Sequence, residues 1–184
     1  MSELPTIETE RLTLRPFILA DAPDVQRLAG DRNVASSTLE IPHPYKDGMA
    51  EEWIAALQVG LDRGEDVTFA IVHRDEEYLI GCAGMSIRKR DESGSMGYWI
   101  GKPYWNQGYC TEAARALLEY GFEVLGLNRV YSAHFTRNPA SGRVMQKIGM
   151  KHEGTLRQDV RKWGRFEDVE RYGILKSEYA SSDE

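Results

Sequence analysis

The chain has 184 residues, of which 41% are hydrophobic, and a formal net charge of −6 at pH 7. These values predict one globular domain with a core of ordinary size. No apolar run is long enough to span a membrane, the acidic start lacks the pattern of a signal peptide, and the two cysteines do not indicate a disulfide framework. We therefore expect a cytoplasmic protein that binds neither membranes nor nucleic acid, because nucleic-acid binding depends on a basic surface.

The charge is spread unevenly along the chain. Residues 1–80 carry a formal charge of −9, whereas residues 81–184 carry +3. The second half therefore suits an anionic ligand, and the first half suits a cationic one.

Four elements are predicted before residue 66. Alternating apolar residues over Arg11–Arg15 indicate a strand. A helix is predicted over Asp21–Gly30, because a capping residue and an early proline begin it. Two prolines make Ser36–Tyr45 a predicted loop, and helical spacing predicts a second helix from Asp47 to about Gly60. The inward face of the second helix is expected to carry Trp53, Ala56, Leu57 and Leu61.

Most of the remaining chain is predicted to be strand, with helices between some of the strands. The strands are expected at Val67–His73, Tyr78–Ile87, Ser95–Ile100, Arg129–Phe135, Lys151–Trp163 and Phe166–Leu175. The first two form one hairpin and the last two form another, which turns at Gly164. Strands with interspersed helices indicate an α/β fold with a mixed sheet.

A short helix is predicted after the fourth of these strands. Asn138 takes the N-cap position, Pro139 is the first helical residue, and Gly149 ends the helix. Its buried side chains are expected to be Ala140, Val144 and Ile148.

The stretch Tyr104–Ala114 joins a strand to a longer helix. Apolar and small residues alternate over Met96–Ile100, and apolar residues recur at helical spacing after the stretch, so that the helix begins near Thr111. The first N–H groups of a helix have no partner within it and lie at the positive end of its dipole. Because Gly108 lets the backbone approach a ligand closely, this turn can bind a phosphate or pyrophosphate. The alternative is a plain turn, since neither the Walker spacing nor the three-glycine dinucleotide pattern is present.

Five motifs occur in an order that is typical of one family. They are Thr9–Arg15, Gly97–Ile100, Tyr104–Ala113, Asn138–Ser141 and Lys147–Met150. Together they resemble the GNAT N-acetyltransferase superfamily, in particular the branch of Rim-type enzymes that acetylate the N-termini of ribosomal proteins.

The resemblance covers nearly the whole chain and implies a GNAT domain over residues 1–176, followed by a polar tail over residues 177–184. It implies a single-domain fold whose mixed, mostly antiparallel sheet is splayed at the centre and flanked by helices. It also implies acetyl-CoA as the donor substrate, with its pantetheine arm in the splay, and no metal. Relatives often dimerise, so a homodimer is an open alternative.

The same resemblance assigns the donor-binding residues. The pyrophosphate loop is placed at Trp105, Asn106, Gln107, Gly108, Tyr109 and Cys110, and the N–H groups near Thr111 complete it. Trp105 and Asn106 depart from the residues common in the wider superfamily, but the loop binds through its backbone. Asn138 and Ser141 match positions that contact the cofactor in relatives, and for Asn138 a plain N-cap is the alternative. Strand N–H groups at Trp99, Ile100 and Gly101 are candidates for polarising the thioester carbonyl.

Acetyl transfer needs a neutral amine, and the pKa of the amine decides how strong a base is required. Deprotonating an α-amino group at pH 7 costs about 1 kcal/mol, whereas a lysine amine costs about 4–5 kcal/mol. Direct attack of a terminal amine on the bound donor is therefore the simplest scheme.

Candidates for proton transfer are few. Ser141 is the candidate proton donor to the leaving sulfur, with helix capping as the alternative. Relatives often carry Glu at the position of Ser95, so we name His134 as a substitute base, although a strand histidine is commonly structural. Glu112 is expected to serve the helix dipole, and Cys110 is expected to be a small residue rather than an acyl carrier.

We therefore predict an enzyme, an N-acetyltransferase that moves an acetyl group from acetyl-CoA to a primary amine. The α-amino group of a protein or peptide is the leading acceptor. A small-molecule amine and a non-catalytic acyl-CoA-binding module are the alternatives. The walls that select the acceptor are expected in the loops at Ser36–Asp47 and Lys162–Phe166.

Overall fold

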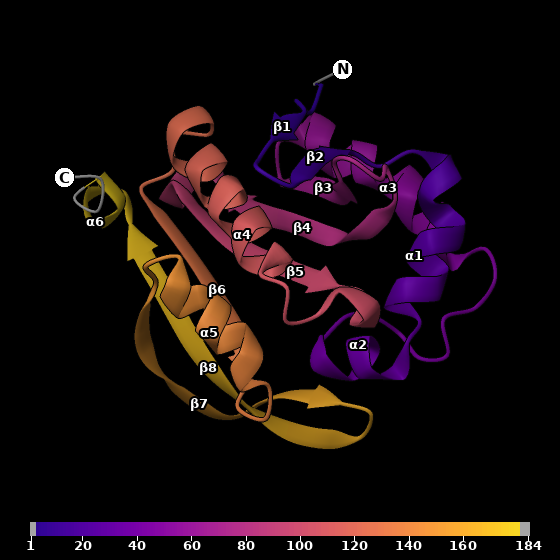
Figure 1. Cartoon of the computed structure of the whole chain (residues 1–184). Coiled ribbons are helices and arrows are strands. Elements are labelled where there is room, and N and C mark those ends of the chain that lie inside the picture. The colour runs from indigo at the N-terminus through magenta and orange to yellow at the C-terminus, as the bar shows by residue number, and fades with distance from the viewer. Residues whose placement is uncertain (1–2, 181–184) are drawn as a thin grey trace.

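The computed structural model describes residues 3–180, which form one eight-stranded sheet with helices on both faces (Figure 1). The strands are β1 (Ile7–Glu8), β2 (Leu12–Pro16), β3 (Asp66–His73), β4 (Leu79–Arg88), β5 (Ser93–Ile100), β6 (Arg129–Phe135), β7 (Lys151–Lys162) and β8 (Arg165–Leu175). The helices are α1 (Ala22–Ala29), α2 (Arg32–Ser37), α3 (Met49–Arg63), α4 (Tyr109–Glu119), α5 (Pro139–Lys147) and α6 (Lys176–Ala180). The strand order is β1-β2-β3-β4-β5-β6-β8-β7.

The sheet opens between its two central strands. All neighbouring strands pair antiparallel except β5 and β6, which are parallel and pair only where Ser93–Ser95 faces Arg129–Tyr131. Just beyond the last pair, the Ser132 hydroxyl donates to the Met96 carbonyl at 2.8 Å, and the strands then separate. This confirms the predicted α/β fold with a mixed, mostly antiparallel sheet that is splayed at its centre.

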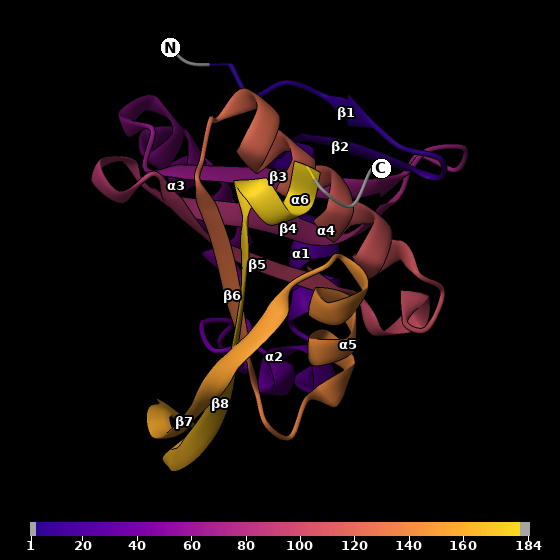
Figure 2. The same ribbon diagram turned by 90° about the vertical axis from the view of Figure 1, so that its left-hand side faces the viewer.

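Helices cover both faces of the sheet because β3 is apolar on both sides. Phe69 and Ile71 belong to the core beneath α4 and α5, whereas Ala70 and Val72 belong to the core beneath α1 and α3. Successive strand residues point to opposite faces, so one strand serves both layers. Figure 2 shows α3 on the opposite side of the sheet from α4 and α5.

Two helical features differ from the sequence prediction in the first half of the chain. The predicted loop from Ser36 begins inside α2, a six-residue helix whose N-cap Asp31 accepts from the backbone N–H of Asn33 at 2.7 Å. α3 was placed correctly within three residues, but Ala56 is exposed, and Ala50 and Ile54 are buried instead. The other three predicted residues, Trp53, Leu57 and Leu61, are half-buried, and Trp53 and Leu61 pack against the core, so only Ala56 was misplaced.

The two site-bearing helices also differ from prediction. α4 begins at Tyr109, two residues before Thr111, and continues into a π-helical turn over Tyr120–Val124. In α5 the residues buried toward the sheet include Gly142 and Met145, whereas Ala140 is exposed. Glycine faces the sheet here because a Cβ at this position would lie 2.5 Å from the ring nitrogen Nε2 of His134.

The C-terminal part is a long hairpin followed by a short helix. β7 and β8 are joined at Trp163 and Gly164, which both have positive φ, as in a type I′ turn. The proposed start of the polar tail falls within α6, where the Tyr179 ring lies 5.2 Å from the Phe122 ring. Residues 181–184 of that tail lie outside the described residues. Within residues 3–180, none of the helices combines the length and the apolar composition needed to cross a membrane.

Candidate active site

The open edge of β5 presents backbone groups to the gap beside β6. The Gly101 N–H donates to the Ile80 carbonyl at 2.8 Å and so faces β4. Because alternate residues of a strand point their N–H and C=O groups to opposite edges, Trp99 also faces β4, whereas Tyr98 and Ile100 face the gap. Of the three N–H groups predicted to polarise a thioester carbonyl, only that of Ile100 therefore points into the opening.

The loop that follows β5 leads directly into α4. Asn106 and Gly108 both have positive φ, of 62° and 84°, and Gly108 occupies the N-cap position without a side-chain cap among the described residues. The first i to i−4 bond of the helix runs from the Glu112 N–H to the Gly108 carbonyl at 3.1 Å. The N–H groups of Tyr109, Cys110 and Thr111 consequently have no acceptor within the helix, which is the arrangement that binds phosphate groups.

The side chains of this loop hold it to its surroundings. The indole N–H of Trp105 donates to the Ile100 carbonyl at 2.6 Å, which fixes the loop against the end of β5. The Gln107 amide turns back to the Pro103 carbonyl at 3.2 Å. The Trp105 N–H donates to the Lys102 carbonyl at 3.3 Å, so the backbone donors left for a ligand come from the later part of the loop and the start of α4.

Ser141 and Tyr98 form a pair at the start of α5. The Ser141 hydroxyl donates to the phenol oxygen of Tyr98 at 3.1 Å, and the phenol donates to the Ser141 carbonyl at 3.1 Å. Burial raises the pKa of the Tyr98 phenol, and the bond from Ser141 only partly opposes this. Both hydroxyl groups are therefore neutral proton carriers at physiological pH.

Cys110 lies in the first turn of α4, where burial lowers the reactivity of its thiol as a nucleophile. Burial raises the pKa of its thiol to about 12, although part of the residue is exposed. The thiolate is the nucleophilic form of cysteine, so this environment does not favour an acyl carrier. This agrees with the expectation that Cys110 is not an acyl carrier.

His134 lies on β6 beneath α5. Its Nδ1 is 2.8 Å from the Phe135 carbonyl, a contact that requires the proton on Nδ1 and leaves Nε2 as an acceptor. Nε2 is buried without a hydrogen-bond partner among residues 3–180 and lies against Gly142, which neighbours Ser141. His134 can therefore accept a proton at Nε2, but the backbone of α5 covers that nitrogen.

Asn138 takes the predicted N-cap position but does not cap α5 with its side chain. Its amide instead donates to the Ser37 carbonyl at 3.4 Å, at the end of α2. The plain N-cap interpretation of its side chain is therefore wrong. The reason is tertiary, because α2 brings a backbone acceptor to the position where Asn138 starts the helix.

The segment from α1 to Ile41 spans the open end of the sheet. On one side, Gly101 at the end of β5 packs against α1, where a Cβ would lie 2.6 Å from Leu28. On the other side, Arg137 donates to the Ser36 carbonyl at 2.8 Å. The ammonium of Lys162 donates to the carbonyls of Leu39 and Ile41 at 2.9 and 2.7 Å. The two loops that were expected to form acceptor walls thus contact each other.

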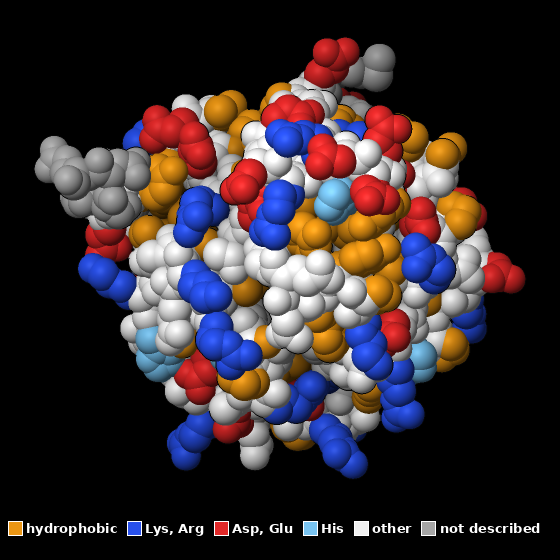
Figure 3. Space-filling model, viewed as in Figure 1, with side chains coloured by type: hydrophobic (Ala, Val, Ile, Leu, Met, Phe, Trp, Pro, Cys, Tyr) orange, Lys and Arg blue, Asp and Glu red, His pale blue; other side chains and the backbone are white. Residues whose placement is uncertain are grey.

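Basic side chains lie along α5 and along α4, the helix that follows the turn at Trp105–Cys110. Arg115 on α4 and Arg143 and Lys147 on α5 are exposed. Figure 3 shows lysine and arginine side chains running down the face formed by these two helices. A positive surface next to unpaired helix N–H groups favours an anionic ligand.

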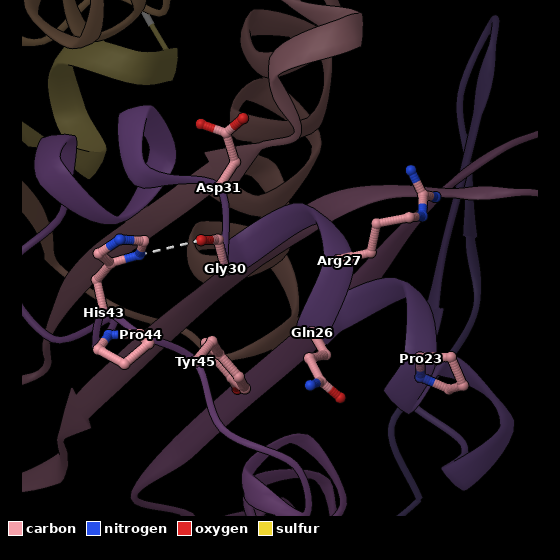
Figure 4. A pocket seen from close by; sticks show the side chains of 8 residues that line it. All are labelled: Pro23, Gln26, Arg27, Gly30, Asp31, His43, Pro44 and Tyr45. Atoms are coloured by element: carbon pink, nitrogen blue, oxygen red, sulfur yellow. Dashed lines mark hydrogen bonds between the residues drawn. The ribbon is translucent and has the colours of Figure 1, made fainter.

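An open cavity of about 590 Å³ lies elsewhere, beside α1 and the loop around Pro44. Its polar side chains include Gln26, Arg27 and Asp31, which point in different directions (Figure 4). His43 is held to the Gly30 carbonyl at 3.2 Å. His43, Pro44 and Tyr45 of the predicted acceptor loop line this cavity, but none of the predicted catalytic or donor-binding residues does. Because its polar groups do not converge on one point, we assign no ligand to it. In the described part of the chain, no three His, Cys, Asp or Glu side chains are grouped as a metal site.

Sequence reasoning missed the contact between Arg11 and the turn at Trp105–Cys110. Its guanidinium reaches the Gln107 carbonyl at 2.9 Å and pairs with Glu112 at 2.7 Å. Glu112 therefore does more than complement the helix dipole. Both residues lie in motifs that carried the family resemblance, but their contact joins positions 101 residues apart.

Comparisons with known proteins identify related chains. A family model described as "Acetyltransferase (GNAT) domain" matches residues 11–151. The "Uncharacterized N-acetyltransferase p20" of Bacillus licheniformis is 31% identical over 96% of this chain and 99% of its own length. The spermidine N(1)-acetyltransferase of Vibrio cholerae is 25% identical over 95% of this chain and 98% of its own length.

Solved structures share the whole fold. The GNAT-family acetyltransferase of Bacillus anthracis superposes with a TM-score of 0.82 at 26% identity and covers 94% of this chain and 99% of its own. RimL, a ribosomal L7/L12 α-N-protein acetyltransferase in complex with coenzyme A, has a TM-score of 0.85 at 18% identity, with 93% of this chain and 98% of its own covered. At that identity the second similarity shows the fold alone.

Proposed function

Because the chain belongs to the GNAT acetyltransferase family, we propose that it transfers an acetyl group from acetyl-CoA to the α-amino group of a protein or peptide. Family membership confirms the resemblance predicted from the motifs and makes the chain an acyl-CoA-dependent transferase. The observation that carries the donor assignment is the uncapped N-terminus of α4 beside the opening of β5 and β6. Cytoplasmic location is part of this proposal, and a homodimer remains an alternative to the monomer.

Backbone groups of the chain would bind three parts of acetyl-CoA: the diphosphate, the pantetheine arm and the thioester carbonyl. The N–H groups of Tyr109, Cys110 and Thr111 would bind the diphosphate. The backbone groups of Tyr98 that face the gap would pair with an amide of the pantetheine arm, in place of a neighbouring strand. The Ile100 N–H would then polarise the thioester carbonyl and stabilise the oxyanion that develops there.

Acetyl transfer in this site would proceed by direct attack. The neutral amine forms a bond to the carbonyl carbon, the C–S bond breaks, and the Ser141 hydroxyl gives its proton to the leaving sulfur. The amine loses one proton to solvent water, because Nε2 of His134, the predicted base, is buried beneath the backbone of α5. Ser141 regains its proton from solvent, directly or through the neighbouring phenol of Tyr98, so that protons balance over one turnover.

The acceptor wall favours a peptide amine over a polyamine. At the turn of the β7–β8 hairpin, residues 161–166 carry three basic side chains, Arg161, Lys162 and Arg165, and no acidic one. The acidic residues Asp159, Glu167 and Asp168 lie further along the two strands. Lys162 donates to two carbonyls rather than to a carboxylate, so these contacts do not neutralise its charge. A polycation would be repelled by this wall, whereas a peptide with acidic side chains near its N-terminus would be attracted.

Two alternative functions are each favoured by one observation. The similarity to a spermidine acetyltransferase over 95% of the chain favours a small amine. The serine at position 95, where relatives often carry a carboxylate, favours a module that binds acyl-CoA without turnover.

A thiol-release assay with acetyl-CoA tests the proposal and separates these alternatives. Three acceptors are compared: an acidic peptide with a free N-terminus, the same peptide with a blocked N-terminus and one lysine, and spermidine. We expect release only with the free N-terminus, because its amine is the easiest to deprotonate and its charge suits the wall. Faster release with spermidine would overturn the acceptor assignment. Tight binding of acetyl-CoA without release in a broad amine screen would overturn the enzymatic assignment.

A further inference from the structure

The segment just before β2 is joined to the start of α4 by a compact set of hydrogen bonds. Glu112 accepts at Oε1 from the Thr9 hydroxyl at 2.7 Å and from the Arg11 backbone N–H at 2.8 Å. At Oε2 it accepts from Nε of Arg11 at 2.8 Å and from its Nη2 at 2.7 Å. The side chain of Glu112 is only 16% exposed. These bonds hold the guanidinium of Arg11 in one orientation.

The remaining arm of that guanidinium reaches the turn at Trp105–Cys110, where the donor diphosphate is proposed to bind. Nη1 of Arg11 donates to the Gln107 carbonyl at 2.9 Å. The plane of the guanidinium lies over the Tyr109 ring, with Cζ 4.6 Å from the ring centroid. Arg11 therefore contacts the residues on both sides of Gly108, and a Cβ at Gly108 itself would lie 3.3 Å from Nη2.

We infer that Arg11 is a positioning residue for the donor, because it fixes the peptide group that precedes α4. The Gln107 carbonyl and the Gly108 N–H belong to one planar trans peptide unit, so they point in opposite directions. With the carbonyl held by Arg11, the Gly108 N–H points away from Arg11. It adds a fourth donor to the N–H groups of Tyr109, Cys110 and Thr111.

The contribution of Arg11 is geometric rather than purely electrostatic. Its charge is compensated by Glu112, so it adds little net positive potential at the turn. Gly108 and Asn106, both at positive φ, leave the loop several backbone alternatives, and without the Arg11 contact this peptide unit could rotate. A lysine could not replace the arginine fully, because one ammonium lacks the planar fork that spans Glu112 and Gln107.

This inference rests on the proposed placement of the donor diphosphate at the turn, and two ligands separate the two claims. Coenzyme A carries the diphosphate, whereas pantetheine carries only the arm that would lie between β5 and β6. The dissociation constants of both are measured for the full chain, by calorimetry for coenzyme A and by NMR titration for pantetheine. Thermal unfolding of every variant establishes that it is folded at the temperature of the binding measurement.

We expect Arg11→Gln to weaken coenzyme A binding about tenfold while changing pantetheine binding less than about twofold, and Arg11→Lys to lie between Arg11→Gln and the wild type. Arg15→Gln is the matched control. Arg15 lies on β2 and makes an equivalent forked pair with Asp21, at 2.8 Å for both bonds. It should alter stability without altering the ratio of the two constants.

Two other results would refute either the role of Arg11 alone or both claims. If Arg11→Gln leaves the ratio of the two constants unchanged while the wild type prefers coenzyme A, the role of Arg11 is refuted and the diphosphate placement stands. If the wild type binds both ligands equally, the diphosphate placement itself is refuted, and the role of Arg11 is refuted with it.

Discussion

The hydroxyl of Ser141 and the phenol of Tyr98 bind each other through a closed pair of hydrogen bonds, each 3.1 Å long, which includes the Ser141 carbonyl. The pair joins the first turn of α5 to the part of β5 that faces the opening. Because burial raises the pKa of the Tyr98 phenol, neither group can serve as a base near neutral pH. Both hydroxyl groups therefore carry their protons at neutral pH, and the departing thiolate is the group that would accept one from Ser141.

Ser141→Ala should lower kcat by about 100-fold with little change in the affinity for acetyl-CoA, because one proton-transfer step is lost while the binding backbone is intact. Steady-state kinetics with an active acceptor, together with calorimetry, measures both quantities. Donors whose leaving thiol is more acidic need less protonation and should partly restore the rate of this variant. Tyr98→Phe is the matched control, since it removes the partner hydroxyl but keeps that of Ser141, and it should lose less activity. An unchanged kcat in Ser141→Ala would remove Ser141 from the mechanism.

Lys162→Met should raise KM for the acceptor without changing the affinity for acetyl-CoA. The variant removes the bonds to the carbonyls of Leu39 and Ile41, which hold the segment across the open end of the sheet. Leaving two partly buried carbonyls without a donor should also lower the free energy of unfolding by about 1–3 kcal/mol. Urea unfolding and acceptor titrations measure the two effects.

The control for that variant is Lys151→Met. Lys151 begins the same hairpin strand but is exposed and pairs with Glu178 at 2.5 Å, far from the acceptor wall in sequence and sheet register. It should leave KM unchanged and should alter the free energy of unfolding by no more than a few tenths of a kcal/mol. Equal effects of the two substitutions on KM would show that Lys162 does not shape the acceptor wall.

Neither cysteine should be alkylated in the folded protein at pH 8. Burial raises the pKa of both thiols, Cys82 and Cys110, to about 12, so only about one thiol in ten thousand is ionised at that pH. Mass spectrometry after iodoacetamide treatment, with and without urea, measures this, and urea should expose both sites. Cys110→Ala should retain most of its activity, because direct attack needs no acyl-enzyme. A stable acetyl group found on Cys110 during turnover would contradict direct attack.

The sequence contained enough local information to predict most strands and the strand-to-helix turn at Gly108. β6 occupies the predicted Arg129–Phe135, because a strand of seven residues has a clear pattern and definite ends. The turn was predictable because Gly108 and the helical spacing after it lie within one short stretch. By contrast, α2 is six residues long, and its single capping aspartate was too weak a signal beside the prolines that follow.

The sequence did not reveal which side chains would be hydrogen-bonded to which distant residues. Asn138 has the position of an N-cap, yet its amide binds Ser37, which comes from a segment 101 residues earlier. Similarly, Arg11 and Glu112 each lie in a recognisable motif, but neither motif indicates that the other is its partner. Such contacts depend on how the sheet places distant segments side by side.

The pairing of Arg11 with Glu112 should also give the protein a specific dependence of stability on pH. Burial alone would raise the pKa of the Glu112 carboxyl, but the hydrogen bonds from Thr9 and Arg11 outweigh it and lower the pKa below the ordinary value of 4.5. A carboxyl whose pKa is lower in the folded state stabilises that state above its unfolded pKa, and the effect is lost as pH falls through the folded value. The wild type should therefore be more stable than Glu112→Gln at pH 6 to 7, and the difference should shrink steadily below about pH 4.5. Urea unfolding of both proteins at several pH values measures this difference.

Glu153→Gln is a suitable comparison, because Glu153 also pairs with an arginine, Arg129, but lies on the exposed face of β7, away from the turn. A stability difference for Glu112→Gln that stays constant from pH 7 to pH 3 would show that the charge on Glu112 does not bind the N-terminal segment to α4.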